Sequence, residues 1–279
     1  MSTPEPARPQ PSFAGKVALI AGASRGIGAV TARAFARAGA AVVLAARDGK
    51  ALDEVAGEIR AAGGRALAVP TDIGDAAAVE RLIDRVVVAF GRLDCAFNNA
   101  TDGPMPALLA DIDVDDFDRG IRVNIRGTFL GMRYQIPAML RTGGGAIVNM
   151  ASVAGLYGFT GLSAYVAGKA GIIGLTRVAA LDYADQGIRV NVVAPGPILT
   201  HHLERAGEEA QRQAGQSTPM RRIGRSEEVA DAVLWLCSEQ SSFITGATIP
   251  IDGGQFAGLK PPGRSYRQGK PMDRASDAG

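Results

Sequence analysis

The chain has 279 residues, 47% of them hydrophobic, and a formal net charge of +2 at pH 7. This length and apolar content suit one domain with a large core. The end of the chain carries the positive charge, because residues 255–279 hold five basic and two acidic side chains, a net +3, which leaves the body at −1. The body shows no basic patch, so we expect no nucleic-acid partner.

Three features of the sequence bear on where the protein is located. The run from Thr142 to Gly168 has no charged residue and is long enough to raise the question of a membrane span, but its glycines, serines and tyrosines argue against one. No charged segment followed by an apolar run opens the chain, so we expect no signal peptide. Cys95 and Cys237 lie in apolar runs and are expected to be buried free thiols, which fits a cytoplasmic protein.

The two ends of the chain differ in composition from its middle. Residues 1–12 are rich in proline and serine and have almost no apolar content, which predicts a disordered arm. We place a single structured domain at residues 13–254 and expect residues 255–279 to form a basic, flexible tail.

A glycine-rich turn follows the first predicted strand, Val17–Ala21. Its glycines are spaced Gly22-x-x-x-Gly26-x-Gly28, and an alanine-rich helix is expected over residues 29–38. Glycines let the backbone approach a ligand closely, and the N–H groups and dipole of a helix start favour negative charge. The spacing differs from the Gly-x-Gly-x-x-Gly of the standard dinucleotide fingerprint. Strand, turn and helix together nevertheless predict a pyrophosphate site, against the alternative of an ordinary glycine-rich turn.

Strand-like and helix-like segments alternate along the rest of the domain. The helix over residues 75–90 is the clearest, because its apolar residues form one stripe. Further strands are expected at residues 41–46, 66–69, 93–98, 146–150, 189–194 and 248–251, and further helices at residues 50–62, 114–135, 165–183 and 226–237. This alternation predicts an α/β fold with a single Rossmann-type doubly wound parallel sheet of about seven strands and helices on both faces.

Ser152, Tyr165 and Lys169 form a candidate catalytic group. Tyr165 and Lys169 are four residues apart, so on a helix they share one face. A cation close to a phenol favours the phenolate, so we expect Lys169 to lower the pKa of Tyr165. Ser152 follows a predicted strand and should lie at its carboxyl end, where open α/β sheets bind ligands. Taken alone, Tyr-x-x-x-Lys is also typical of an exposed helix face.

With these residues in order, together with Asn98-Asn99-Ala100, Asn124 and Pro195-Gly196, the chain resembles the short-chain dehydrogenases/reductases from about Phe13 to Gly254. The resemblance implies that Tyr165 is the acid/base and that Ser152 orients the substrate oxygen. It implies that Lys169 lowers the tyrosine pKa and binds the nicotinamide ribose. Asn124 is then expected to hold a water in a proton relay to Lys169.

The resemblance also implies a set of cofactor contacts. Asp72 is expected near the adenine, Asn98 and Ala100 beside the nicotinamide, and Ile198 and Thr200 at the carboxamide, although Asp72 and Asn124 are also types that cap or tie loops. With the arginines considered below, the residues expected to bind cofactor are Gly22, Ser24, Arg25, Gly26, Ile27, Gly28, Arg47, Asp72, Ile73, Asn98, Ala100, Tyr165, Lys169, Pro195, Gly196, Ile198 and Thr200.

The sequence departs from the family pattern at two positions. Ala21 stands where the family usually has threonine, which removes a hydroxyl tie to the neighbouring strand. Thr101 replaces the glycine that often follows Asn-Asn-Ala, and it restricts the backbone and adds bulk near the nicotinamide. Neither departure removes a catalytic group.

The residues after the second strand bear on the choice of cofactor. A carboxylate there commonly binds the ribose 2′-OH of NAD, whereas the 2′-phosphate of NADP needs cations. Arg47 stands where such a carboxylate would, and Arg25 lies in the glycine turn. Guanidinium groups suit phosphate geometry, which favours NADP(H). Asp48, one residue further on, leaves NAD(H) possible, and two solvated surface arginines are the plain alternative.

Loops at the catalytic edge predict a mostly apolar space for a small carbonyl or alcohol substrate, lined by Leu156, Tyr157, Phe159, Pro197, Ile198 and Leu199. Residues 201–223 have helical character and predict a mobile lid over this space. His201 and His202 lie in the lid without partners at metal-ligand spacing, so we expect no metal site.

Two functions outside the favoured one stay open. One is an NAD-dependent alcohol or sugar dehydrogenase, and the other is a non-catalytic dinucleotide-binding protein, against which the intact Asn124, Ser152, Tyr165 and Lys169 argue. The predicted helices that begin at Val114 and Ser163 carry apolar residues on more than one face, namely Ile121, Phe129 and Met132 on the first and Ile172, Leu175 and Val178 on the second. We therefore expect burial against further subunits, and the resemblance implies a homotetramer.

Overall fold

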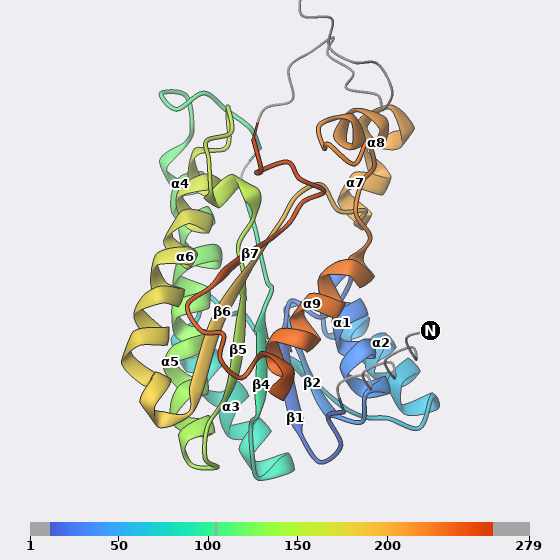
Figure 1. Cartoon of the computed structure of the whole chain (residues 1–279), viewed down its shortest axis with the longest axis vertical. Coiled ribbons are helices and arrows are strands. Elements are labelled where there is room, and N and C mark those ends of the chain that lie inside the picture. The colour runs from blue at the N-terminus through green and yellow to red at the C-terminus, as the bar shows by residue number, and fades with distance from the viewer. Residues whose placement is uncertain (1–11, 104, 259–279) are drawn as a thin grey trace, which may run out of the picture.

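The computed structural model describes residues 12–103 and 105–258, so most of the predicted arm and tail lies outside the described residues. Seven parallel strands form one sheet in the order β3-β2-β1-β4-β5-β6-β7 (Figure 1). They are β1 (Val17–Ala21), β2 (Ala41–Ala46), β3 (Arg65–Pro70), β4 (Cys95–Asn98), β5 (Gly145–Met150), β6 (Ile188–Pro195) and β7 (Thr248–Ile251). The predicted sheet is confirmed, and β1 lies between β2 and β4.

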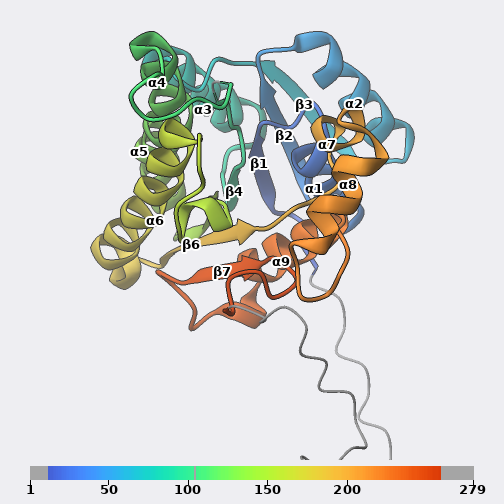
Figure 2. The same cartoon turned by 90° about the horizontal axis from the view of Figure 1, so that it is seen from above.

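Helices cover both faces of the sheet because its strands are apolar on both sides. In β1, Ala18 and Ile20 pack toward one helical layer, and Val17 and Leu19 pack toward the other. The first layer contains α1 (Gly26–Arg37), α2 (Gly49–Ala61) and α9 (Ser226–Cys237), and the second contains α3 (Ala76–Phe90), α5 (Gly127–Leu140) and α6 (Ser163–Tyr183). Figure 2 shows α5 and α6 together on one side and α1 and α9 on the other.

One predicted helix is interrupted. Instead of a continuous helix over residues 114–135, the chain forms α4 (Val114–Ile121), one π-helical turn η1 (Arg122–Arg126), and α5, which continues to Leu140. The Asn124 side-chain amide donates to the carbonyl oxygen of Gly120 at 2.9 Å, and the Thr128 hydroxyl donates to the carbonyl oxygen of Asn124 at 2.8 Å. Side chains thus bond to backbone groups at this turn, and π-helical turns are frequent at functional sites.

The helix that carries Tyr165 is both long and apolar. By length and composition α6 is the one helix among the described residues that could cross a membrane, with 44% of its most apolar window buried. This is weak evidence, because core helices pass the same test. In the fold, α6 packs on β6 and α4. Its own residues Ile172 and Thr176 are buried in this contact.

The predicted lid forms two short helices. These are α7 (His201–Arg205) and α8 (Gly207–Gln216), and Gly207 begins the second with a positive φ of 87°. They follow β6 and rise above the carboxyl end of the sheet (Figure 1). The chain then returns through Gly224, which bridges to Ile198, and enters α9.

Candidate active site

The glycine turn after β1 is built against the loop that follows β4. A Cβ on Gly22 would lie 2.7 Å from the Cα of Ala100, and one on Gly28 would collide with the carbonyl oxygen of Gly22. The Asn99 amide donates to that same carbonyl oxygen at 3.0 Å. Asn99 is therefore a structural residue of the site that the sequence indicated only as the middle of a motif.

The start of α1 fits the pyrophosphate of a dinucleotide. The first N–H groups of a helix have no partner within it, and the N-cap residue Arg25 makes no side-chain capping bond to them. Gly26 has a φ of 54°, and a Cβ added there would lie 3.8 Å from the Thr200 methyl group, in ordinary contact. Thr200, which was predicted at the carboxamide, therefore lies beside the turn, and Ser24, Arg25 and Ile27 are at least partly exposed along it.

Three charged residues, Arg47, Asp48 and Asp102, lie beside the carboxyl end of β2. The Arg47 side chain is 71% exposed, and its guanidinium lies 3.7 Å from a carboxylate oxygen of Asp102. Asp48 accepts a hydrogen bond from the N–H of Ala51 at 3.1 Å, so its carboxylate caps α2. Arg47 is thus the cation available at the end of β2, whereas Asp48 already has a structural partner.

Asp72 follows β3 and is tied to η1. Its carboxylate accepts from the Arg122 guanidinium at 2.8 Å and from the N–H of Gly74 at 2.9 Å. Burial by itself raises the pKa of Asp72, but these two hydrogen bonds and the charges of Arg122 and Arg47 bring it below its ordinary value. The carboxylate therefore stays ionised near Arg47, and the next residue, Ile73, packs against Gly127.

Ser152, Tyr165 and Lys169 come together at the carboxyl end of β5. Ser152 follows β5 and caps the short helix η2 (Val153–Gly155), accepting from the N–H of Ala154 at 3.1 Å. The Ser152 hydroxyl lies close enough to Tyr165, which projects from the first turn of α6, to lower the pKa of the phenol. Lys169 is 1% exposed, and its Nζ lies 5.5 Å from the centre of the Tyr165 ring. The structure thus joins the three residues that the sequence grouped.

The electrostatics of this group differ from the sequence-based expectation. Burial raises the pKa of Tyr165, and the hydrogen bond with Ser152 offsets only part of that increase. Burial also lowers the pKa of Lys169 to about 7. The Lys169 Nζ donates to the carbonyl oxygen of Met150 at 3.0 Å, and burial disfavours the charged form that would stabilise a phenolate.

Asn124 is fully buried in η1, and every polar group of its side chain is bonded. The amide nitrogen donates to the carbonyl oxygens of Gly120 and Asp102, and the amide oxygen accepts from the Thr101 hydroxyl at 2.8 Å. Its Cβ faces Gly168 of α6, where an added Cβ would lie 2.9 Å away. Asn124 therefore lies next to the helix of Tyr165 and Lys169, and Thr101, noted only as a departure from the family pattern, is one of its partners.

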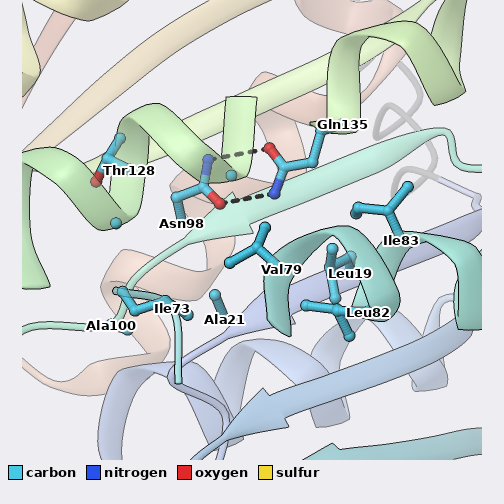
Figure 3. Close-up of a pocket in the computed structure, with 12 residues that line it drawn as sticks. Leu19, Ala21, Ile73, Val79, Leu82, Ile83, Asn98, Ala100, Thr128 and Gln135 are labelled. Atoms are coloured by element: carbon cyan, nitrogen blue, oxygen red, sulfur yellow. Dashed lines mark hydrogen bonds between the residues drawn. The ribbon is translucent and has the colours of Figure 1, made fainter. Parts of the chain in front are cut away.

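The side chain of Asn98 points away from the glycine turn. Asn98 and Gln135 face each other in a reciprocal amide pair, with donor–acceptor distances of 2.7 and 3.1 Å (Figure 3). Asn149 accepts a further hydrogen bond from Asn98 at 2.9 Å. A small cavity of about 10 Å³, roughly the size that holds one water, lies beside the pair and is also lined by Ala100 and Thr128. Any contact of Asn98 with a cofactor would therefore use its backbone.

The segment after β6 lies across the carboxyl edge of the sheet. Pro195 ends β6, and the N–H of Gly196 donates to the carbonyl oxygen of Ile251 at 3.1 Å. A Cβ on Gly196 would lie 2.9 Å from the Cα of Asp252, so this crossing leaves no room for a side chain. Ile198 is buried, and Thr200 reaches the glycine turn.

Tyr157, Phe159 and Phe256 form an aromatic shelf, and the first two follow Ser152 in the chain. Tyr157 stacks on Phe159 with ring centres 5.1 Å apart, and it lies nearly parallel to Phe256 at 6.1 Å. Phe256 is held by a hydrogen bond from its N–H to Asp252 at 2.6 Å. The sequence predicted the first two residues as pocket lining but placed Phe256 outside the domain, because no pattern of the chain links it to a loop almost 100 residues earlier.

The lid histidine that can be described makes only a loose contact. His201 Nδ1 lies 4.0 Å from the Glu204 carboxylate on the same exposed helix. Within residues 12–103 and 105–258, no group of three histidine, cysteine, aspartate or glutamate side chains is arranged to hold a metal ion.

Comparison with known proteins adds to this geometry. The family model described as enoyl-(acyl carrier protein) reductase matches residues 22–255. The chain is 41% identical to cyclohexanol dehydrogenase of Acinetobacter sp. (strain SE19), over 86% of this chain and 95% of that protein. It is also 41% identical to cis-4-hydroxycyclohexanecarboxylate dehydrogenase of Sinomonas cyclohexanicum, over 88% of this chain and 98% of that protein.

The crystal structure of levodione reductase is similar throughout its length. It matches with a TM-score of 0.86 and 33% identity, covering 88% of this chain and all of that chain. The seven-stranded sheet, the glycine turn and the grouping of Ser152, Tyr165 and Lys169 agree with this likeness. The chain therefore belongs to the short-chain dehydrogenase/reductase family, whose members are oxidoreductases that act on small-molecule alcohols and ketones with NAD(P)(H).

Proposed function

We propose that the protein is an NADP(H)-dependent oxidoreductase that interconverts a ketone and a secondary alcohol, with Tyr165 as the acid/base. The observation that carries this proposal is that Ser152, at the carboxyl end of β5, and buried Lys169, with its Nζ 5.5 Å from the Tyr165 ring centre, flank the same phenol. A non-catalytic dinucleotide-binding protein has no need of a buried phenol and lysine, whose burial costs free energy. The glycine turn supplies a cofactor site that fits this chemistry.

The side chains have distinct roles in this proposal. The Ser152 and Tyr165 hydroxyls hold the substrate oxygen, and Tyr165 gives it a proton during reduction and takes one during oxidation. The raised pKa of Tyr165 keeps the phenol protonated at neutral pH, which suits reduction. The bound nicotinamide supplies or accepts the hydride. Lys169 would bind the ribose of the nicotinamide. It also exchanges protons with the Tyr165 phenol, and water held at Asn124 connects Lys169 to solvent.

Arg47 and Arg25 support NADP(H) as the cofactor. Both are exposed at the rim of the glycine turn, where a 2′-phosphate would meet a guanidinium. Asp48 is the residue that would favour NAD(H), but its carboxylate caps α2. An NAD-dependent alcohol or sugar dehydrogenase is therefore the second candidate, and it requires Asp48 to leave its cap or the backbone to bind the ribose.

The aromatic shelf supports a ring-shaped apolar substrate. Tyr157, Phe159 and Phe256 stack on one another and form an aromatic surface of the kind that packs well against a ring. Two relatives are named for cyclohexanol and for a hydroxycyclohexanecarboxylate. We infer that this chain accepts alicyclic ketones and secondary alcohols.

We also propose that the protein is cytoplasmic and assembles as a homotetramer. Both cysteines are buried and free, which is compatible with a reducing compartment. Phe129, Val178 and Leu181 expose apolar surface on α5 and α6, and burial of this surface against another subunit would remove it from water.

Turnover of a panel of cyclic and open-chain ketones and alcohols with each cofactor tests the proposed activity. We expect cyclic ketones to be reduced with NADPH at least tenfold more efficiently than with NADH, as one lost phosphate contact of ~1.4 kcal/mol implies. Tyr165→Phe should lower kcat by ~10²-fold or more while cofactor binding persists. Near-normal turnover of that variant would remove Tyr165 from the mechanism, and equal use of both cofactors would contradict the NADP(H) assignment.

A further inference from the structure

The partner of Arg47 lies across the cofactor groove. Arg47 follows β2, and Asp102 lies in the loop after β4, with 3.7 Å between guanidinium and carboxylate. The sheet order places β1 between these two strands. Neighbouring strands are ~4.8 Å apart, so the ends of β2 and β4 are separated by ~10 Å. The ion pair therefore spans the carboxyl end of β1, where the glycine turn begins.

The glycine turn is anchored to the same two strands that carry the ion pair. The N–H of Gly22 donates to Ala45 of β2 at 2.7 Å, and the carbonyl oxygen of Gly22 accepts from Asn99 after β4 at 3.0 Å. The Arg47–Asp102 pair thus joins the two strand ends between which the glycine turn, the expected start of the dinucleotide site, is anchored. The Asp102 side chain is only 26% exposed, so the loop holds the carboxylate in place.

Asp102 also touches the proton-relay side of the site. Its carbonyl oxygen accepts from the Asn124 amide, and a Cβ on the next residue, Gly103, would lie 3.7 Å from the Tyr165 ring. A shift of this loop would therefore be felt at Asn124 and Tyr165. Asp102 therefore connects Arg47, beside the expected ribose site, with Asn124 and Tyr165 at the expected catalytic site.

We propose that Asp102 is a specificity-determining residue, an internal anion that holds Arg47 across the groove and competes with the 2′-phosphate of NADP(H) for it. This inference rests on the proposed role of Arg47 in NADP(H) binding. In the free enzyme the carboxylate occupies the guanidinium. When NADP(H) binds, Arg47 exchanges the Asp102 carboxylate for the 2′-phosphate. The loop that carries Asp102 then loses its contact with Arg47 at the end of β2. NAD(H), which has no 2′-phosphate, has nothing to exchange and leaves the pair intact.

The test is calorimetric titration of Asp102→Asn with NADPH and, separately, with NADH. The variant should bind NADPH about two- to fivefold more tightly at low ionic strength, the range that an exposed ion pair contributes. NADH affinity should not change, and the gain for NADPH should shrink as salt is added. Asp111→Asn is the matched control, because it removes the same charge from the same exposed loop and should change neither affinity.

Arg47→Ala and the double variant separate this inference from the proposed function. If Arg47 binds the phosphate, Arg47→Ala weakens NADPH binding. The double variant Arg47→Ala/Asp102→Asn should then bind NADPH no more tightly than Arg47→Ala alone. An unchanged NADPH affinity in Arg47→Ala would overturn the NADP(H) assignment and this inference together. Weaker binding in Arg47→Ala with no effect of Asp102→Asn would overturn only the inference. An equal gain with and without Arg47 would also overturn it, because Asp102 would then act by plain repulsion.

Discussion

Burial acts in opposite directions on the two ionisable groups at the centre of the site. It raises the pKa of Tyr165 by disfavouring the phenolate, and it lowers the pKa of Lys169 to about 7 by disfavouring the ammonium. Both groups are therefore pushed toward their uncharged forms near neutral pH. The Ser152 hydrogen bond is the contact that pulls the phenol back toward ionisation.

Replacing Ser152 should move the pH dependence of alcohol oxidation. Oxidation needs the phenolate, so its rate rises with pH until Tyr165 is ionised. Ser152→Ala removes the hydrogen bond that lowers the tyrosine pKa, and the rising limb of kcat/KM should shift to higher pH as the residual rate falls. Ser152→Thr keeps a hydroxyl and is the control that should retain the limb near its wild-type position. If the rising limb of kcat/KM stays at the same pH in Ser152→Ala, the group that titrates is not Tyr165.

Lys169 should make the folded state more stable as pH rises from about 7 to 9. Its pKa falls to about 7 on folding, so above this pH the unfolded chain binds more protons than the folded one. The free energy of unfolding then increases with pH, by at most ~1.4 kcal/mol per pH unit from this group. Above pH ~10 the raised pKa of Tyr165 acts in the other direction, which sets the upper limit of the window.

Urea unfolding at pH 7, 8 and 9 measures this effect against Lys169→Met. Methionine is similar in length and has no charge to desolvate, so the variant should lack the increase with pH. The free energy of unfolding of the wild type, relative to that of the variant, should therefore increase from pH 7 to 8 and again from pH 8 to 9. Parallel pH dependence of the two proteins would show that Lys169 stays charged in the fold.

At the scale of elements, the sequence predicted the sheet but not the break between α4 and α5. The strands are apolar on both faces and short, so the alternation of apolar runs with helical patterns was sufficient. The π-turn η1 depends on contacts that no local pattern records. Asn124 bonds to Thr101 and Asp102, which lie 23 and 22 residues earlier, and its Cβ faces Gly168, which lets α6 approach.

The same limit applies to the candidate site. Ser152, Tyr165 and Lys169 could be grouped from sequence, because a strand end and a helical spacing of four bring them together. The Arg47–Asp102 pair, the capping role of Asp48 and the inward turn of Asn98 depend on which loops meet at the sheet edge. Side-chain direction at these positions is set by tertiary partners, so spacing along the chain does not predict it.

The hydrogen bond from Thr101 to Asn124 should make Thr101 a positioning residue for the relay. Thr101→Val keeps the branched shape but leaves the Asn124 amide oxygen without this donor, which costs about 1–3 kcal/mol at a buried group. We expect kcat to fall severalfold with KM for the cofactor nearly unchanged. Thr101→Ser restores the donor and should restore kcat. A serine variant as slow as the valine variant would show that the branched side chain, rather than the hydroxyl, matters.

At the scale of the whole molecule, several apolar side chains stay exposed after the domain is folded, and three of them lie on α5 and α6. Phe129 on α5 is 45% exposed, and Val178 and Leu181 on α6 are 55% and 83% exposed. Of the other residues expected to face a partner, Met132 and Ile172 are buried within the chain, and Ile121 and Leu175 are half-buried. The exposed set is smaller than the sequence indicated, but it lies on the two helices that were predicted to meet another subunit.

Light scattering at micromolar concentration tests the assembly predicted from this surface. We expect the mass of a tetramer for the wild type and a smaller species for Leu181→Glu, because burying a carboxylate in an apolar interface is costly. Val88→Glu is the matched control: Val88 is 84% exposed on α3, outside the α5–α6 face, and the substitution should leave the mass unchanged. A wild-type monomer would contradict the prediction outright. An intact tetramer in Leu181→Glu would move the interface to another part of the surface, such as Phe243 before β7, whose side chain is fully exposed.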